Sequence, residues 1–98
     1  MIARTWHGAT RVEHAEAYLD HLYRTGVAAY QGAPGSLGVV ALRRIVDDRA
    51  EFLFVTLWES ASAVPRGARD PLPDQSRLLV ESDDQPSDYE IVLQLGQV

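Results

Sequence analysis

The sequence predicts an α+β domain of ferredoxin-like βαββαβ topology, a four-stranded antiparallel sheet with its helices on one face. The prediction rests on one amphipathic helical pattern, on a pair of apolar runs joined by a short polar connection, and on the order in which these elements occur. The chain has 98 residues, which is the length of one domain. We therefore expect a single domain spanning residues 1–98.

The first strand and the first helix occupy the N-terminal third of the chain. Residues 2–7 form a short run that begins apolar and ends at Gly8, as a first strand would. Thr10-Arg11-Val12-Glu13 matches a capping box, so we expect a helix to begin there. The turn sequence at 32–35 ends it. The apolar stripe of this helix has a 3.6-residue period and comprises Val12, Ala15, Leu19, Leu22, Tyr23, Gly26 and Tyr30.

The remaining elements follow in the order strand, strand, weak helix, strand. Ser36–Val46 and Ala50–Trp58 are predicted strands of a hairpin, connected through Asp47-Asp48-Arg49. Glu59–Val64 is expected to begin a second helix, which prolines at 65, 71 and 73 keep short. A brief apolar run at 78–80 and a polar turn at 83–88 precede the predicted last strand, Tyr89–Leu95.

The two hairpin strands carry apolar side chains at successive positions, so both of their faces need cover. The apolar positions are Leu37, Val39, Val40, Ala41, Leu42, Ile45 and Val46 in the first strand, and Phe52, Leu53, Phe54, Val55, Leu57 and Trp58 in the second. A sheet with one solvated face would alternate apolar and polar residues. Helices shield only one face, and the other would remain a large apolar patch. We therefore expect a homodimer.

Composition excludes several classes of partner. The net charge of −5 and the pI of about 5.0 disfavour nucleic acid, and no basic run offsets that average. The chain has no cysteine, which fits a reducing compartment. No window reaches the length of a membrane span, and the first residues lack the apolar stretch of a signal peptide. We expect a cytoplasmic protein that binds no membrane.

The histidines do not form a metal site. His14 and His21 lie seven residues apart on the predicted helix, which separates them by roughly 10.5 Å along its axis. Metal-binding pairs on helices lie three or four apart. We therefore expect no metal and no cofactor. His7, at the end of the first strand, is the histidine that could reach a pocket, although a structural or solvated histidine is the simpler alternative.

Two arginines and four aromatic residues are the remaining candidates. Arg43 and Arg44 are adjacent in an apolar strand, so they must point to opposite faces, and the register decides which faces the helix. Either could bind a ligand, or both could be paired structural arginines. Four aromatic side chains could form the wall of a pocket for a flat ligand, and packing in the core is the alternative for each of them. These residues are Trp58, Trp6, Tyr23 and Phe54.

Several segments together resemble the antibiotic biosynthesis monooxygenase-like family. They are residues 2–8 (Ile-Ala-Arg-Thr-Trp-His-Gly), Tyr18-Leu19, Thr25-Gly26-Val27, Pro34-Gly35, Leu42-Arg43-Arg44, Leu57-Trp58-Glu59-Ser60, Leu78-Leu79 and Tyr89-Glu90-Ile91-Val92. The resemblance implies a dimeric α+β barrel. It also implies oxygenation of aromatic polyketide-type substrates without metal or flavin, or the binding and cleavage of haem.

The chain departs from that family at the positions that matter for catalysis. It contains no asparagine, whereas both kinds of family enzyme use one near the tryptophan that Trp58 resembles. The haem-degrading members also need a histidine on the second helix, and all three histidines here precede the second strand. Residues 63–77 are shorter and richer in proline than in the family. These departures argue against haem.

Two functions remain open from the sequence. One is a cofactor-independent monooxygenase in which His7 is the base, Arg43 or Arg44 stabilises an oxyanion, and Trp58 stacks on the substrate ring. The other is a non-catalytic dimer of the same fold that binds a small molecule or is a stress-related protein. Both imply a small hydrophobic or aromatic ligand.

Overall fold

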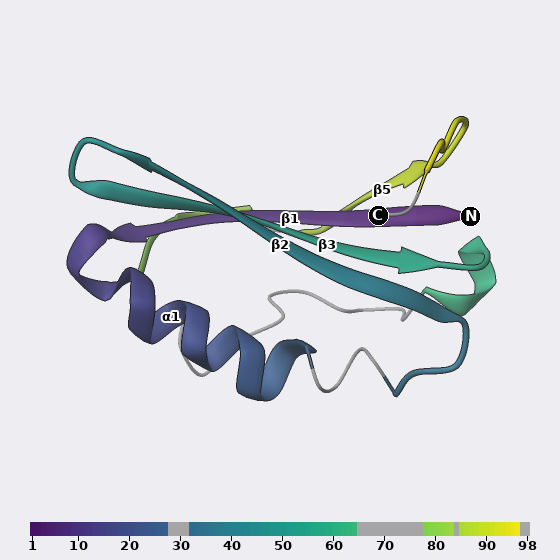
Figure 1. Ribbon diagram of the computed structural model, residues 1–98, viewed down its shortest axis with the longest axis horizontal. Coiled ribbons are helices and arrows are strands. Elements are labelled where there is room, and N and C mark those ends of the chain that lie inside the picture. The colour runs from purple at the N-terminus through teal and green to yellow at the C-terminus, as the bar shows by residue number, and fades with distance from the viewer. Residues whose placement is uncertain (28–31, 65–77, 84, 97–98) are drawn as a thin grey trace.

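The sheet is built around β1 (Ile2–Arg11), which pairs with a strand on each side (Figure 1). On one side it pairs along its whole length with β3 (Arg49–Trp58), which in turn pairs with β2 (Ser36–Val46). On the other side lie two short strands, β4 (Leu79–Ser82) and β5 (Ser87–Glu90). All pairs are antiparallel, and the order is β2-β3-β1-β4 with β5 also on β1.

The computed structural model describes residues 1–27, 32–64, 78–83 and 85–96. The predicted fold class is confirmed, because the strand order and the helix on one face are those of a ferredoxin-like α+β domain. The sheet has five strands where four were predicted. Two short strands share the position of the fourth.

The predicted last strand, Tyr89–Leu95, is wrong in its bounds. β5 begins two residues earlier and ends at Glu90, while residues 91–96 have no regular secondary structure. β5 is held to β1 by an ion pair in which Arg4 Nε lies 2.7 Å from Asp88 Oδ1. The hydrogen bond from Arg4 lowers the pKa of Asp88. The pairing of β5 with β1 therefore ends at the pair Glu90–Ile2, where the chain leaves β1.

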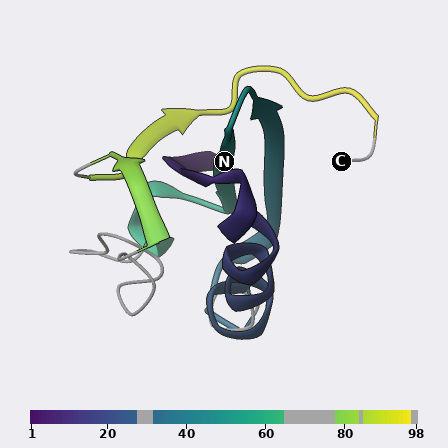
Figure 2. The same cartoon turned by 90° about the vertical axis from the view of Figure 1, so that its left-hand side faces the viewer.

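The helical part between β1 and β2 begins with a 3-10 turn at Val12–His14 and continues as α1 (Ala15–His21). Residues 22–27 continue it as a π-type helix. Viewed end-on, this helical segment lies on one side of the sheet (Figure 2). Within the described residues, no helix is long and apolar enough to cross a bilayer. The predicted extension to Tyr30 lies outside the described residues.

The predicted capping box is wrong. β1 runs through Thr10 and ends at Arg11, because its ladder with β3 extends to the pair Arg11–Arg49 beside the hairpin turn. Thr10 is buried, and its hydroxyl donates to the carbonyl of Arg11 at 3.0 Å. Glu13 forms an ion pair with Arg11 at 2.6 Å, and no side chain caps the helix. Thr10 and Arg11, which the local pattern assigned to the start of a helix, are therefore part of β1 because they pair with β3.

The β2–β3 hairpin and the segment after β3 match the sequence prediction in part. Val46 pairs with Arg49, so the hairpin loop consists of Asp47 and Asp48 alone. Asp47 has a φ of 56°, which a two-residue hairpin loop requires and aspartate tolerates. In place of the helix predicted over Glu59–Val64, the structure has a 3-10 turn at Ala61–Ala63. Any continuation falls at 65–77, outside the described residues.

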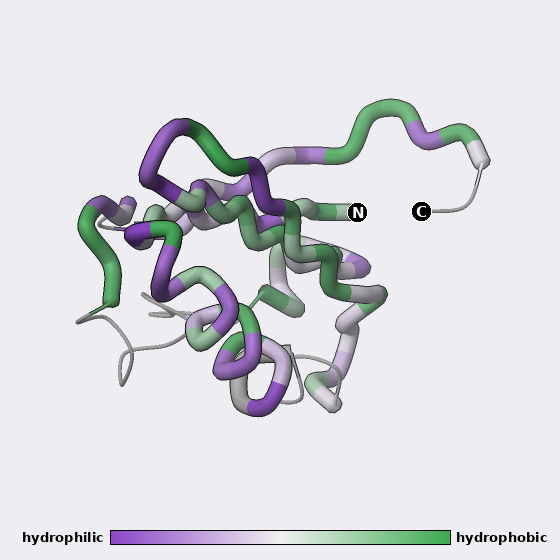
Figure 3. The backbone as a smooth tube through the Cα atoms, turned by 60° about the vertical axis from the view of Figure 1, so that its left-hand side comes forward, coloured by the Kyte–Doolittle hydropathy of each residue, from purple (hydrophilic) through white to green (hydrophobic). Residues whose placement is uncertain are grey.

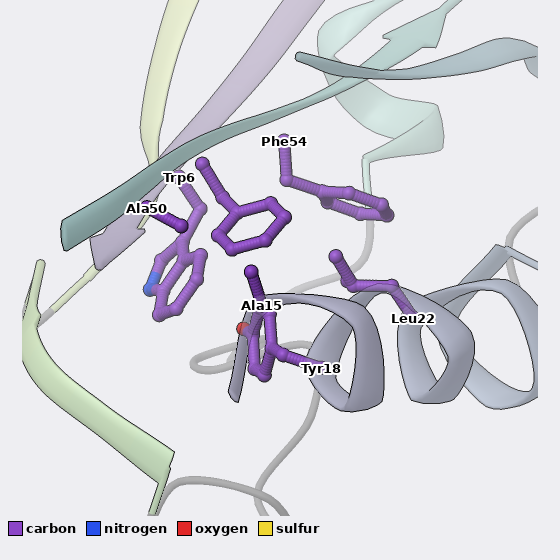
Figure 4. Packing of buried hydrophobic residues seen from close by; sticks show 7 residues of the cluster. Trp6, Ala15, Tyr18, Leu22, Ala50 and Phe54 are labelled. Carbon is purple, nitrogen blue, oxygen red and sulfur yellow. The ribbon is translucent and has the colours of Figure 1, made fainter. Parts of the chain in front are cut away.

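The core lies between the sheet and α1 (Figure 4). Trp6 on β1 and Phe54 on β3 point toward the helical segment, to which α1 contributes Tyr18 and the following π-type helix contributes Leu22. Phe52 on β3 belongs to the same cluster. The rings of Tyr18 and Phe52 pack with centroids 5.1 Å apart and planes inclined by 58°. Each of these five side chains is at most 3% exposed. This face of the sheet is filled by packed aromatic side chains.

Gly8 is required by the position of the Trp6 ring. A Cβ atom at Gly8 would lie 2.6 Å from a ring carbon of Trp6, which is closer than real contacts allow. We expect Gly8→Ala to lower the free energy of unfolding by about 1–3 kcal/mol, because the buried indole must shift in a packed core. Urea unfolding measures the effect. Gly32→Ala is the control, since a Cβ there meets nothing within 4 Å, and an equal loss in both variants would contradict the explanation.

Candidate functional site

The sheet has one face toward α1 and one open face. The register pairs Trp6 with Phe54 on the helix side, so the alternate residues of each strand point away from the helix. We call this second surface the open face. Its central residues are Thr5 and His7 on β1, Leu53, Val55 and Leu57 on β3, and Val40, Leu42 and Arg44 on β2. Leu42 and Leu53 are 48% and 39% exposed.

The two arginines point to opposite faces, as adjacent strand residues must. Arg43 is opposite Phe52 and faces α1, where its Nη1 lies 2.7 Å from Glu16 Oε1. Arg44 is opposite Glu51 and is ion-paired with it on the open face. The structure therefore settles which arginine faces the helix, a choice that the sequence left open.

A pocket of about 400 Å³ opens around His7. Leu42, Leu53 and His7 lie side by side across β2, β3 and β1, because each pairs with its neighbour in register. The pocket therefore combines an apolar floor with the imidazole of His7, two arginines and one carboxylate. Its lining residues are His7, Leu42, Arg43, Arg44, Glu51, Phe52 and Leu53.

The backbone of His7 is held by Asp83, which lies between β4 and β5. The N–H of His7 donates to Asp83 Oδ2 at 2.9 Å, and the N–H of Asp83 donates to the carbonyl of His7 at 2.9 Å. The indole N–H of Trp6 donates to the Asp83 carbonyl at 3.2 Å. Sequence reasoning missed Asp83, because its contact spans 76 positions and depends on the interrupted edge strand.

The aromatic candidates lie on the other side of the sheet from His7 and Arg44. Trp58, Trp6 and Phe54 are 0%, 2% and 3% exposed, and the indole of Trp58 donates to the hydroxyl of Thr56 at 2.8 Å. Tyr23 is 74% exposed and is not part of that buried group. The sheet thus separates the tryptophan predicted to stack on a substrate from the histidine predicted to act as base. Pocket-lining roles for the four aromatic residues stay a prediction.

Further charged side chains border the open face near the hairpin. Arg49 is ion-paired with Glu81, and this hydrogen bond lowers the pKa of Glu81. In the described part of the chain, no group of three or more His, Cys, Asp or Glu side chains is placed to hold a metal ion. The open-face site can therefore offer a base, cations and an apolar floor to an organic ligand.

The fold and this site define the class of protein as a small ferredoxin-like α+β domain with a ligand-sized pocket on its open face. The sequence matches no protein-family model and no curated protein. Solved structures do match it. A candidate antibiotic biosynthesis monooxygenase from Deinococcus radiodurans superposes with a TM-score of 0.72 at 15% identity, over 100% of this chain and 99% of that one.

Two further solved structures are similar to this chain. A candidate antibiotic biosynthesis monooxygenase from Bacillus cereus has a TM-score of 0.71 at 13% identity, over 100% of this chain and 97% of that one. The heme degrader MhuD from Mycobacterium tuberculosis, with two hemes in its active site, has a TM-score of 0.58 at 22% identity, over 96% and 99%. The resemblance predicted from the sequence is thus confirmed at the level of the fold.

Proposed function

We propose that this chain is a cofactor-independent monooxygenase of the antibiotic biosynthesis type, acting in the cytoplasm on a small, electron-rich aromatic molecule bound on the open face. The observation that carries the proposal is the pocket of about 400 Å³ in which His7 and Arg44 stand beside the apolar side chains of Leu42 and Leu53. An apolar floor with a few convergent polar groups is the usual form of a small-molecule site. The fold shared with monooxygenase candidates supports the same class.

The chemistry needs a base and a place for negative charge. The imidazole of His7 takes a proton from an acidic CH₂ group of the substrate, and the guanidinium of Arg44 stabilises the resulting oxyanion. The substrate anion then reduces O₂, one oxygen atom enters the product as a carbonyl, and the other leaves as water. The overall balance is R₂CH₂ + O₂ → R₂C=O + H₂O, so the substrate supplies all the electrons.

The proposed enzyme is a homodimer that pairs its two open faces. The open face carries the half-buried Val40 and Val55 together with the exposed Leu42 and Leu53, and no layer of the described chain covers it. Pairing two such faces would enclose the pocket and remove water from it, which strengthens the interaction of Arg44 with an anion.

A non-catalytic small-molecule-binding dimer is the alternative, and one observation favours it. Arg43 and Arg44 are each ion-paired with a carboxylate of the same chain, Glu16 and Glu51 respectively. A guanidinium that already has a partner is less available to stabilise a new oxyanion, and binding without turnover needs no such charge.

Oxygen consumption with an anthrone as substrate tests the proposal. We expect quinone formation and uptake of one O₂ per anthrone, both reduced about 100-fold or more in His7→Ala because the base is lost. His14→Ala is the control, since His14 is exposed on the 3-10 turn before α1. Saturable anthrone binding without oxygen uptake would leave the non-catalytic alternative. Neither binding nor uptake would refute both.

A further inference from the structure

The strand that carries His7 lies beside an interruption in its edge partner. β1 pairs with β5 up to Thr5 and with β4 from Gly8 onward. Residues 83–86 separate β4 from β5, and we call this interruption the strand break. Figure 3 shows that β4 begins hydrophobic and that the chain is hydrophilic where it enters the break. His7 lies opposite the break, so its backbone groups need hydrogen bonds from something other than a regular strand.

Asp83, the first residue of the strand break, provides both of these hydrogen bonds. In a regular antiparallel pair, two opposite residues exchange N–H to carbonyl bonds in both directions. The N–H of Asp83 follows this pattern and donates to the carbonyl of His7 at 2.9 Å. The carbonyl of Asp83 instead accepts the indole N–H of Trp6 at 3.2 Å. The carboxylate takes the place of that carbonyl, and its Oδ2 accepts the N–H of His7 at 2.9 Å.

This arrangement depends on the kind of side chain at position 83. Aspartate and asparagine both carry a carbonyl-type oxygen on Cγ that can accept a backbone N–H. Alanine has no acceptor, so Asp83→Ala would leave the N–H of His7 without the bond that holds it. The position therefore needs a short side chain with an acceptor oxygen, and an amide oxygen meets that need as well as a carboxylate does.

The imidazole of the residue that Asp83 holds is directed into the pocket. His7 is paired with Leu53 across β1 and β3, and both residues line the pocket on the open face. Because Asp83 bonds both the N–H and the carbonyl of His7, it fixes the direction in which the imidazole leaves β1. A base must lie within hydrogen-bond reach of the proton that it takes. A displacement of about 1 Å can lower a rate by about 100-fold.

We propose that Asp83 is a positioning residue for the proposed oxygenation, and that its carboxylate orients the imidazole of His7 by accepting the backbone N–H of that residue. This inference rests on the proposed function and adds to it a residue that does not touch the substrate. The hydrogen-bond acceptor carries the effect, and the negative charge is not required. Asp83 acts through His7 alone.

Steady-state oxygen uptake with an anthrone compares the full chain with Asp83→Ala and Asp83→Asn. In Asp83→Ala we expect kcat to fall about tenfold or more while KM changes less than about threefold, because the base is displaced and the pocket walls remain. Asp83→Asn should keep kcat within about threefold, since its amide oxygen still accepts the N–H of His7. Asp88→Ala is the control. Asp88 joins the same edge of the sheet to β1 through Arg4, and its loss should also leave kcat within about threefold.

The double variant His7→Ala/Asp83→Ala separates an effect through His7 from a general loss of structure. If Asp83 acts through His7, the change Asp83→Ala should lower kcat no further once the imidazole is gone. Amide hydrogen exchange measured by NMR gives a readout that needs no turnover. The His7 amide should exchange about tenfold faster in Asp83→Ala than in the full chain, and at an unchanged rate in Asp83→Asn.

Four results would each overturn the positioning role and leave the proposed function standing. They are an unchanged kcat in Asp83→Ala, an Asp83→Asn variant as slow as Asp83→Ala, an equal further loss of kcat in the His7→Ala background, and an unchanged exchange rate of the His7 amide in Asp83→Ala. A loss of kcat in Asp88→Ala equal to that in Asp83→Ala would do the same, because the whole edge would then be responsible. A full chain without oxygen uptake would refute the proposed function, and the positioning role with it.

Discussion

Val40→Lys is expected to dissociate the protein into folded monomers, whereas Val39→Lys is expected to unfold it. Val40 is opposite Val55 on the open face, where a lysine would carry its charge into the proposed interface between two sheets. Val39 packs against the core beneath the sheet. Burying an unpaired ammonium group costs several kcal/mol, which amounts to about a thousandfold or more in a dissociation constant.

Light scattering and circular dichroism separate the two outcomes. The full chain should scatter as twice 10.9 kDa at micromolar concentration, and Val40→Lys should halve that mass while keeping the spectrum of a folded protein. Val39→Lys should lose the spectrum. A Val40→Lys protein that remains dimeric would contradict the pairing of open faces, and a monomeric full chain would do so directly.

Trp58→Ala is expected to cost about 3–5 kcal/mol of unfolding free energy, the range for emptying a fully packed aromatic site. The indole is completely buried on the helix side and donates a hydrogen bond to Thr56. Trp58→Phe is the matched control. It keeps most of the ring volume and loses the hydrogen bond, so a smaller loss of about 1 kcal/mol or somewhat more is expected.

Fluorescence decides between this core role and the pocket role predicted from the sequence. The measurement is made in a Trp6→Phe background, so that Trp58 is the remaining tryptophan. A core residue should show no change of emission on addition of a quinone or an anthrone. A small loss of stability in Trp58→Ala, together with a saturable change of Trp58 emission, would place a ligand on the helix side instead.

The sequence predicts the elements of this fold well where one local pattern decides them. The hairpin from Ser36 to Trp58 follows from two apolar runs around a pair of aspartates, and the structure changes its bounds by one residue. The start of the helix was missed, because Thr10 belongs to a ladder with residues about 40 positions away. The end of the last strand was missed for the converse reason, since Val92 has strand propensity but pairs with no strand among the described residues.

The candidate site was only partly accessible to sequence reasoning. His7 and Arg44 could be chosen by residue type, but the register that puts them on one face, and Trp58 on the other, depends on the pairing of three strands. Glu51 and Leu53 belong to no motif, and together with Leu42 they enter the pocket through that register. The available signal was that every second side chain of a strand lies on the same face of the sheet. That signal does not show which of the two faces the helix covers.

The central place of β1 has a consequence for how the chain folds. The β2–β3 hairpin closes over the two residues Asp47 and Asp48, so it can form within microseconds of chain collapse. β1 must then pair on its other side with strands whose residues follow their partners by 69 to 88 positions. Such long loop closures are slow. Until β4 and β5 have paired with it, one side of β1 is an open edge, and unpaired edges favour aggregation.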